Sequence, residues 1–196
     1  MPLDPKLTKF TTVTPISALY SFIQIVTKQG VAKFYPADSI NPSYFLTSES
    51  DTNSQIGFKN NTAAVDIDCD VVIGEPMTIE GQAIISVPFW DAANAGGSTT
   101  AITIAIKKDD GSESIIVTST KDCVIDSNEF KMMVFELTVP KTDLAIGDIL
   151  RFTIAYPERL DANKTLRVFF DPSNLNITAT ILTTTTKVNI PVKIPF

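Results

Sequence analysis

The clearest alternation of hydrophobic and polar positions lies between Phe130 and Tyr156, where two apolar runs are joined by a turn. Successive side chains of a strand point to opposite sides of a sheet, so this alternation predicts two strands with one buried face each. The buried positions are Met133, Phe135, Leu137, Val139, Leu150, Phe152, Ile154 and Tyr156, and the solvated face of the first run holds Lys131, Glu136 and Thr138. Pro140 is predicted to end the first strand, because it lacks a ladder donor, and Gly147-Asp148 is predicted to form the turn.

The same period of two recurs along much of the chain and predicts further strands. The strongest hairpin signal is Lys108-Asp-Asp-Gly111, which separates the runs 101–107 and 114–119. Other strands are expected at 44–47, 64–73, 78–90, 166–171 and 177–181. The run 78–90 is apolar on both faces, which indicates a central strand or one covered on both sides. The polar residues after Thr47 are expected to form a surface loop or a bulged edge.

The two ends of the chain are interpreted differently from its middle. Residues 1–15 are rich in proline and are expected to form an extended arm. Residues 20–26 and 31–35 read as a hairpin around Gly30, although apolar spacing also fits a short helix over 16–26. The tail 188–196 alternates to the last residue, and its prolines at 191 and 195 predict an edge strand. An apolar edge at a chain end suggests cover by another subunit.

About eight to ten strands without helical crossovers predict an all-β fold. We expect a two-sheet antiparallel sandwich, jelly-roll or Ig-like in connectivity, with an extended N-terminal arm. A chain of 196 residues is long enough for one substantial core, so residues 16–196 are assigned to a single domain.

Charge and hydropathy exclude several classes of partner. The net charge of −6 and the pI of about 4.6 lack the basic excess that binding to nucleic acid phosphates requires. No apolar run approaches the ~20 residues of a membrane-spanning helix, and the N-terminus has no apolar signal core. We therefore expect a protein made in the cytoplasm without a leader. Two cysteines make no disulfide framework, so Cys69 and Cys123 are expected to be buried reduced thiols, although a bridge between them stays open.

The candidate chemistry is sparse. The sequence contains no histidine, which removes the Ser-His-Asp and Cys-His constellations and most zinc sites. A glycosidase needs two facing carboxylates, and no spacing singles out a pair among Asp91, Glu113, Asp148 and Glu158. We expect no catalysis and no cofactor. Three more carboxylates alternate on one strand face, at Asp66, Asp68 and Asp70. A flat strand separates them by ~7 Å, so a solvated stripe paired with lysines of a neighbouring strand or subunit is favoured over a calcium site.

A possible ligand region follows the strand that ends at Trp90. Phe89, Trp90 and Asp91 lead into a small, glycine-rich loop, and the two aromatic rings suggest a sugar-stacking platform over 89–100. Burial of these rings in the core is the more common outcome. A phosphate-binding loop is excluded, since no Gly-Lys-Ser/Thr ending follows.

Several short stretches together resemble accessory virion proteins of tailed bacteriophages, of the head-decoration or fibre-adaptor type. They read VAKFYPAD, SYFLTSES, IEGQAIISVPFW, KKDDGSES, TDLAIGDILRFTI and VNIPVKIPF. The resemblance implies a small β-sandwich with a non-enzymatic role in the virion, where it decorates or stabilises the capsid. It implies other virion proteins as partners, such as the major capsid protein. No functional residues are carried over from it, because the group has no defining site.

The ends of the chain supply the candidate contacts for such partners, and a homo-oligomer is expected. From the arm and the tail, the candidate partner-binding residues are Pro2, Pro5, Phe10, Pro191, Ile194 and Phe196. The alternative function is a carbohydrate-binding or receptor-binding module that uses the 89–100 region.

Overall fold

The computed structural model describes residues 29–38, 44–48, 57–61, 65–91, 98–126, 129–156, 166–174 and 183–193, which form strands and turns without a helix. The strands are β1 (Gln29–Asp38), β2 (Tyr44–Thr47), β3 (Gly57–Asn61), β4 (Val65–Val72), β5 (Met77–Asp91), β6 (Ser98–Asp109), β7 (Glu113–Ile125), β8 (Phe130–Leu144), β9 (Ile149–Tyr156), β10 (Leu166–Phe170) and β11 (Lys187–Lys193). The predicted all-β class is therefore confirmed for the described residues.

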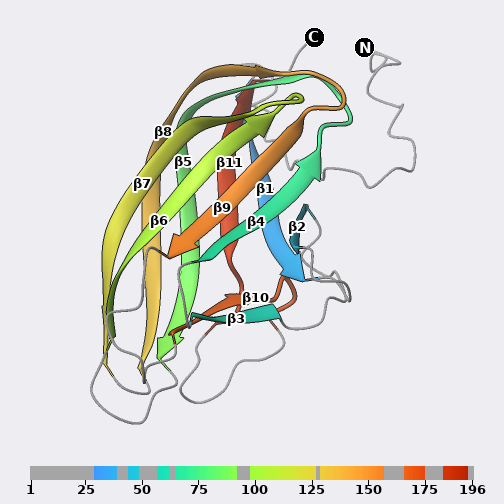
Figure 1. Ribbon diagram of the computed structural model, residues 1–196. Coiled ribbons are helices and arrows are strands. Elements are labelled where there is room, and N and C mark those ends of the chain that lie inside the picture. Colours follow the sequence, from blue (N-terminus) through green and yellow to red (C-terminus); the bar gives the residue numbers. More distant parts are fainter. Residues whose placement is uncertain are drawn as a thin grey trace.

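These strands form one curled, mixed sheet, which Figure 1 shows from its side. The order is β3-β10-β5-β11-β1-β2-β4-β9-β6-β7, and β8 pairs with the other edge of β5. β1 joins the two halves, because Gln29–Phe34 pairs with β11 and Tyr35–Asp38 pairs with β2. β2 and β4 are parallel. The described strands therefore include one parallel pair in a connected sheet, and the expected division into two antiparallel sheets is not confirmed.

The core lies between the two halves of the curled sheet. Phe135 on β8 and Phe152 on β9 are 0% and 1% exposed, as their alternation predicts. Cys69 and Cys123 are also buried and form no disulfide, which agrees with the expected thiols. The inward faces therefore follow from the period-two pattern.

The two predicted turns are present. Gly111 adopts a φ of 108°, and its backbone N–H donates to Asp109 Oδ1 at 2.9 Å, which closes the β6–β7 hairpin. Gly147 adopts a φ of 91° in the turn between β8 and β9. Such backbone angles favour glycine because it has no Cβ.

The prediction that Pro140 ends its strand is wrong. β8 continues to Leu144, and Pro140 lies in a bulge where the register against β5 shifts between Gly81 and Ile79. A bulge leaves a residue outside the ladder, so the missing proline donor is tolerated there. Gly81 has a φ of 121° at this point.

The tail strand is internal, which corrects its predicted edge position. β11 pairs with β5 on one side and with β1 on the other. Pro191 faces the same irregularity of β5, because the β5–β11 register shifts between Asn189 and Val192. The sequence shows that Pro191 cannot donate, but it does not show that a neighbouring strand bends away from it. Val188, Ile190 and Val192 do point inward, as predicted.

β7 and β8 each pair with only one strand, and they contact each other without ladder pairing. Instead, Lys121 Nζ donates to the Val134 carbonyl at 2.7 Å, and Lys131 Nζ donates to the Val124 carbonyl at 2.5 Å. We call this pair of contacts the lysine bridge. Lys131 is half-buried, so its placement on the solvated face is wrong; it shares the parity of the inward residues of β8.

Some predicted elements lie outside the described residues. These are the arm 1–15, the run 20–26 with its helical alternative 16–26, the strand 177–181 and the last three residues. Within the polar stretch after Thr47, β3 forms an edge strand against β10, which its polar composition did not single out.

Replacing Gly81 by alanine is expected to destabilise the fold by about 1–3 kcal/mol. Its φ is unfavourable for other residues, and an added Cβ would lie 3.3 Å from Cγ of Pro191. Gly74→Ala is the matched control, since no atom lies within 4 Å of its added Cβ. Urea unfolding of both variants measures the difference, and equal stabilities would contradict a strained position at Gly81.

Lys131→Ala is expected to lower the free energy of unfolding by about 1–2 kcal/mol, because a charged donor leaves the Val124 carbonyl. The exposed Lys141 on the same strand provides the control, and its alanine variant should change stability by less than about 0.5 kcal/mol. Thermal unfolding compares the two variants, and similar losses would argue against the lysine bridge.

Candidate functional site

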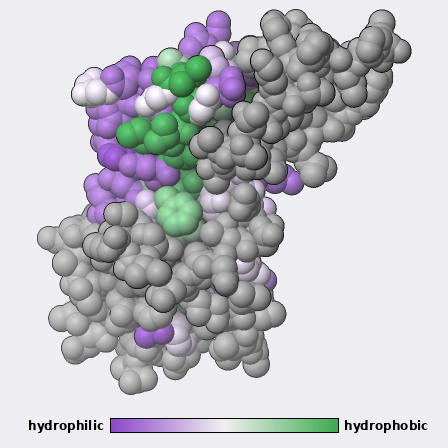
Figure 2. Space-filling view, turned by 90° about the vertical axis from the view of Figure 1, so that its right-hand side faces the viewer, coloured by the Kyte–Doolittle hydropathy of each residue, from purple (hydrophilic) through white to green (hydrophobic). Residues whose placement is uncertain are grey.

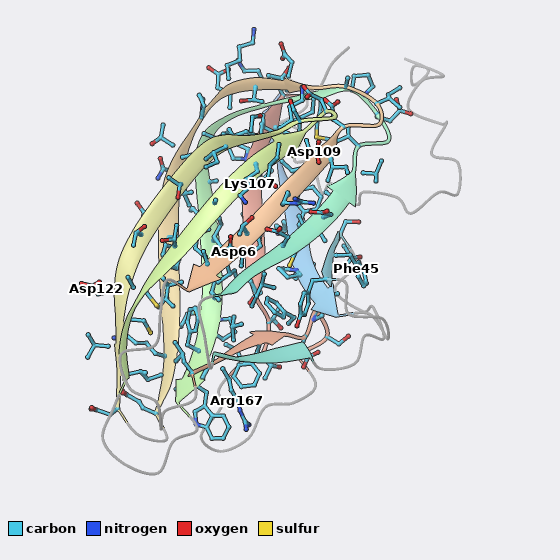
Figure 3. The ribbon with its side chains drawn as sticks, in the orientation of Figure 1. Phe45, Asp66, Lys107, Asp109, Asp122 and Arg167 are labelled. Carbon is cyan, nitrogen blue, oxygen red and sulfur yellow. The ribbon has the colours of Figure 1, made fainter. Side chains whose placement is uncertain are left out.

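The predicted ligand region is mostly internal. Phe89 is 0% exposed and belongs to the core, so its ring is not available as a platform. Trp90 is half-buried at the end of β5, and the guanidinium of Arg167 on β10 stacks over its ring at 4.9 Å (Figure 3). The indole Nε1 is buried and has no hydrogen-bond partner among the described residues. The side chain of Asp91 and the loop 92–97 lie outside the described residues, and glycan binding at this region stays a prediction.

Most of the predicted partner-binding residues also lie outside the described residues. These are Pro2, Pro5, Phe10, Ile194 and Phe196. Pro191 is described, and it lies half-buried inside the sheet between β5 and β1. Its proposed role as an edge residue is therefore corrected.

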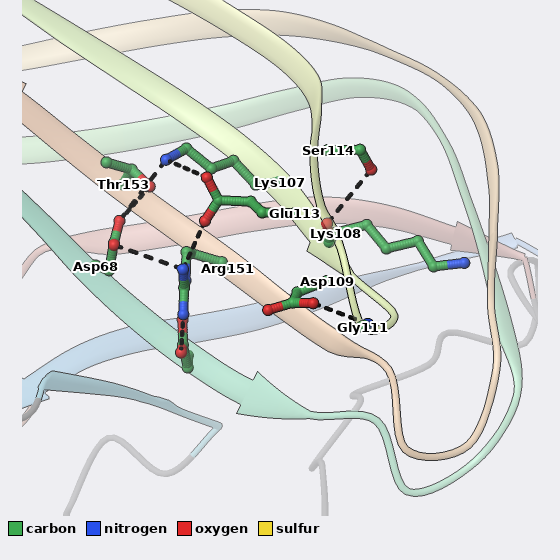
Figure 4. A network of polar contacts seen from close by, with 10 residues as sticks. Asp68, Lys107, Lys108, Asp109, Gly111, Glu113, Ser114, Arg151 and Thr153 are labelled. Atoms are coloured by element: carbon green, nitrogen blue, oxygen red, sulfur yellow. Dashed lines mark hydrogen bonds and ion pairs between the residues drawn. The ribbon is translucent and has the colours of Figure 1, made fainter.

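Among the described residues, a cluster of charged side chains lies on the outer face of β4, β9, β6 and β7. Register places Asp70 opposite Arg151, and Arg151 opposite Lys107. The Arg151 guanidinium donates to both carboxylate oxygens of Asp70 at 2.7 Å and to Glu113 Oε2 at 2.5 Å (Figure 4). Asp68 lies 3.6 Å from the same guanidinium. We call these five residues the Arg151 cluster.

Lys107 and Thr153 complete the contacts of the Arg151 cluster. Lys107 Nζ lies 3.1 Å from Glu113 Oε1, and Thr153 Oγ1 donates to Asp68 at 2.6 Å. Two carboxylates of the predicted acidic stripe are thus paired with a neighbouring strand, as expected. The principal partner of these carboxylates is an arginine rather than a lysine. Glu113, which also contacts Arg151, lies on β7, two strands beyond β9. Arg151 could have been found from its outward parity in the run 150–156.

The electrostatics of the cluster favour its charged forms. Hydrogen bonds from Lys107 and then Arg151 hold the pKa of Glu113 below its ordinary value of 4.5. The carboxylate of Asp70 raises the pKa of Arg151. Bidentate arginine–carboxylate contacts are strong and directional. The cluster therefore holds four strands in register.

A second cluster lies where two turns meet. Lys108 Nζ is 3.0 Å from Asp148 and 3.3 Å from Asp110, and it donates to the Asp143 carbonyl at 3.3 Å. The backbone N–H of Ala145 donates to Asp148 at 2.7 Å, and this bond, followed by Lys108, lowers the pKa of Asp148. The cluster therefore fastens the β6–β7 turn to the β8–β9 turn.

A buried polar clamp joins the residues after β10 to those before β11. Asp171 is 2% exposed, and its carboxylate accepts a hydrogen bond from Thr184 Oγ1 at 2.6 Å. Asn174, at a φ of 54°, accepts the Thr184 backbone N–H at 2.7 Å. The repeated threonines around 184 gave no sequence signal for this clamp, because their partners lie about ten residues away.

The arrangement of charges supports strand cohesion rather than metal binding. The described part of the chain holds no group of three or more His, Cys, Asp or Glu side chains placed to bind a metal ion. Nor do the described residues contain a helix long and apolar enough to cross a membrane.

No protein-family model matches the chain, and no curated protein matches it either. Solved structures show a likeness of fold. An aminopeptidase from the marine sediment archaeon Thaumarchaeota archaeon aligns at a TM-score of 0.62 and 7% identity, over 85% of this chain and 37% of its own. A CocE/NonD family hydrolase from Staphylococcus aureus aligns at 0.60 and 9% identity, over 84% and 36%.

The chain therefore spans little more than a third of the length of these two proteins, and the likeness shows the fold alone. A chain from the infectious bursal disease virus Gx strain covers 100% of this sequence at 15% identity, with 46% of its own length aligned. Its TM-score is 0.39, which is too low to bear on function.

The unfolding free energy is expected to fall as the pH drops below about 4.5, the ordinary pKa of Glu113. A carboxylate with a lowered folded pKa contributes stability above its unfolded pKa, and this contribution is lost as the pH falls through the folded value. Glu113→Gln should therefore show a shallower decline between pH 5 and pH 3, measured by denaturant unfolding at each pH. Parallel declines of both proteins would contradict the ion pairing of Glu113.

Proposed function

We propose that this chain is a non-enzymatic structural protein of a virus particle, which decorates or stabilises a capsid through contacts with other proteins. The observation that carries the non-enzymatic part is the use of charged side chains as ties between strands. Lys107 contacts two carboxylates and Arg151 contacts three. These groups are committed to the fold.

The pKa shifts of the candidate carboxylates support the same conclusion. A glycosidase acid needs a pKa raised by an apolar site, so that it holds its proton near neutral pH. The pKa values of Glu113 and Asp148 are lowered instead, because cations and a backbone N–H stabilise their anions. Neither carboxylate is therefore suited to act as a general acid.

Exposed apolar side chains support a role in protein contacts. Val72 is 63% exposed on β4, and Ile84 and Val134 are 46% and 44% exposed on β5 and β8. Figure 2 shows an apolar strip beside polar residues on the side of the molecule that carries β2 and β4. Apolar surface of this kind commonly marks protein-binding sites.

In this proposal the two halves of the curled sheet act as the two layers of a β-sandwich.

The virion assignment rests on the resemblance to accessory proteins of tailed bacteriophages. The proposed location is the virion, and the proposed partners are other virion proteins, such as the major capsid protein. The fold likeness to an aminopeptidase and a hydrolase does not favour a catalytic role, since this sequence has no histidine for a Ser-His-Asp triad.

Particles purified from cells that produce the chain are expected to contain it at a fixed copy number, measured by quantitative mass spectrometry. Deleting residues 1–15 should abolish its incorporation while circular dichroism stays unchanged, because the proline-rich arm is proposed to bind a partner. Lys141→Ala, an exposed change, serves as the incorporation control. A chain abundant in the cells but absent from their purified particles would contradict the virion role.

A further inference from the structure

One row of residues crosses four neighbouring strands on the outer face of the β8–β5–β11–β1 half of the sheet. Ile84 on β5 pairs with Glu136 on β8 and with Asn189 on β11, and Asn189 pairs with Lys33 on β1. Residues that pair directly across a sheet point to the same face. The row thus runs from an acid, through an isoleucine and an amide, to a base.

The centre of this row is apolar and exposed. Ile84 is 46% exposed, although the residues on either side of it in β5, Ala83 and Ile85, are 0% exposed. Val134 lies diagonally across from Ile84 on β8 and is 44% exposed. The sequence of 78–90 predicted that both faces of this strand are covered, but no described strand covers the outer face of β5. An isoleucine and a valine therefore meet solvent at the middle of a central strand pair.

The two charges at the ends of the row are not compensated within the described chain. Glu136 and Lys33 are both exposed, and neither forms an ion pair with another described residue. They are separated by three strand spacings of about 4.8 Å, or ~14 Å, which is too far for contact. On the opposite outer face, by contrast, Arg151 joins carboxylates of two other strands.

We propose that the outer face of β8, β5, β11 and β1 binds the same face of a second copy of this chain. The two-fold axis runs parallel to the strands, between β5 and β11. Rotation about this axis places Glu136 of each copy against Lys33 of the other, and it brings the two exposed isoleucines toward the centre. The contact is isologous, so each complementary charge pair occurs twice.

The charge pattern selects both the occupant and its orientation. A two-fold axis perpendicular to the strands would set Glu136 against Glu136 and Lys33 against Lys33, which is repulsive. The axis along the strands avoids this repulsion and agrees with the near alignment of strands in face-to-face sheet packing. A second copy supplies both an apolar centre and a charge of opposite sign at each end of the row. The inference goes beyond the proposed function, because self-association is independent of any role in a particle.

Sedimentation equilibrium of the full chain is expected to show a dimer that weakens as salt is added. Glu136→Lys alone and Lys33→Glu alone should each raise the dimer dissociation constant about tenfold or more, since each creates two like-charge contacts. The double variant Glu136→Lys/Lys33→Glu should restore the wild-type constant. An equimolar mixture of the two single variants should form a mixed dimer.

Ile84→Glu tests the apolar centre and is expected to abolish the dimer, with no rescue by the charge swap. Ile146→Glu is the matched control, because Ile146 is 66% exposed on the β8–β9 turn and lies outside the proposed contact. Circular dichroism checks that each variant is folded. A monomeric wild-type chain at about 100 μM, about tenfold above the dissociation constant of a weak dimer, would overturn the proposal.

A folded double variant that stays monomeric would overturn it as well, and so would a wild-type oligomer that is insensitive to Ile84→Glu. These outcomes differ from failure of the proposed function, which is measured by particle content. A dimeric chain that is absent from particles would contradict only the virion role, and a monomeric chain present in particles would contradict only the dimer.

Discussion

Two missing backbone donors, at Pro140 and Pro191, shape the sheet around its longest central strand. They lie on strands β8 and β11, on opposite sides of β5, and the register of both neighbours shifts close to Gly81. Gly81 takes a φ that other residues adopt only at a cost, and it leaves space for the Pro191 ring. A regular ladder would leave carbonyl groups of β5 facing proline nitrogens. The bulge removes this conflict and lets the sheet curl.

Charged side chains then add contacts between strands that backbone ladders already join. The Arg151 cluster ties β4, β9 and β7 across one outer face, and Lys108 ties two turns together. In these contacts, several carboxylates that look available in the sequence are paired with cations of other strands. The opposite outer face is different, because Glu136 and Lys33 flank an exposed isoleucine without ion pairs among the described residues. The two outer faces therefore differ in how far their charges are paired within the described chain.

The sequence predicts what depends on neighbouring residues and misses what depends on distant strands. Alternation placed Phe135 and Phe152 in the core correctly, and Gly111 marked its hairpin. Pro140 and Pro191 were misplaced, since a bulge becomes visible only when the partner strand is known. Of the candidate sites, Asp68 and Asp70 were expected to find basic partners, and they do. Their main partner lies more than 80 positions away in the chain, so local pattern could not identify it.

The lysine bridge gives the curled sheet an uneven distribution of local stability. Elsewhere, opening the sheet requires breaking a run of backbone hydrogen bonds, whereas β7 and β8 are joined across their shared boundary by side chains such as Lys121 and Lys131. Local opening follows the weakest boundary of a structure. Amide hydrogens along this boundary are therefore expected to exchange with solvent through small openings, whereas those between β5 and β8 should require larger openings. Lys121 and Lys131 at this boundary also discourage another chain from adding a strand there.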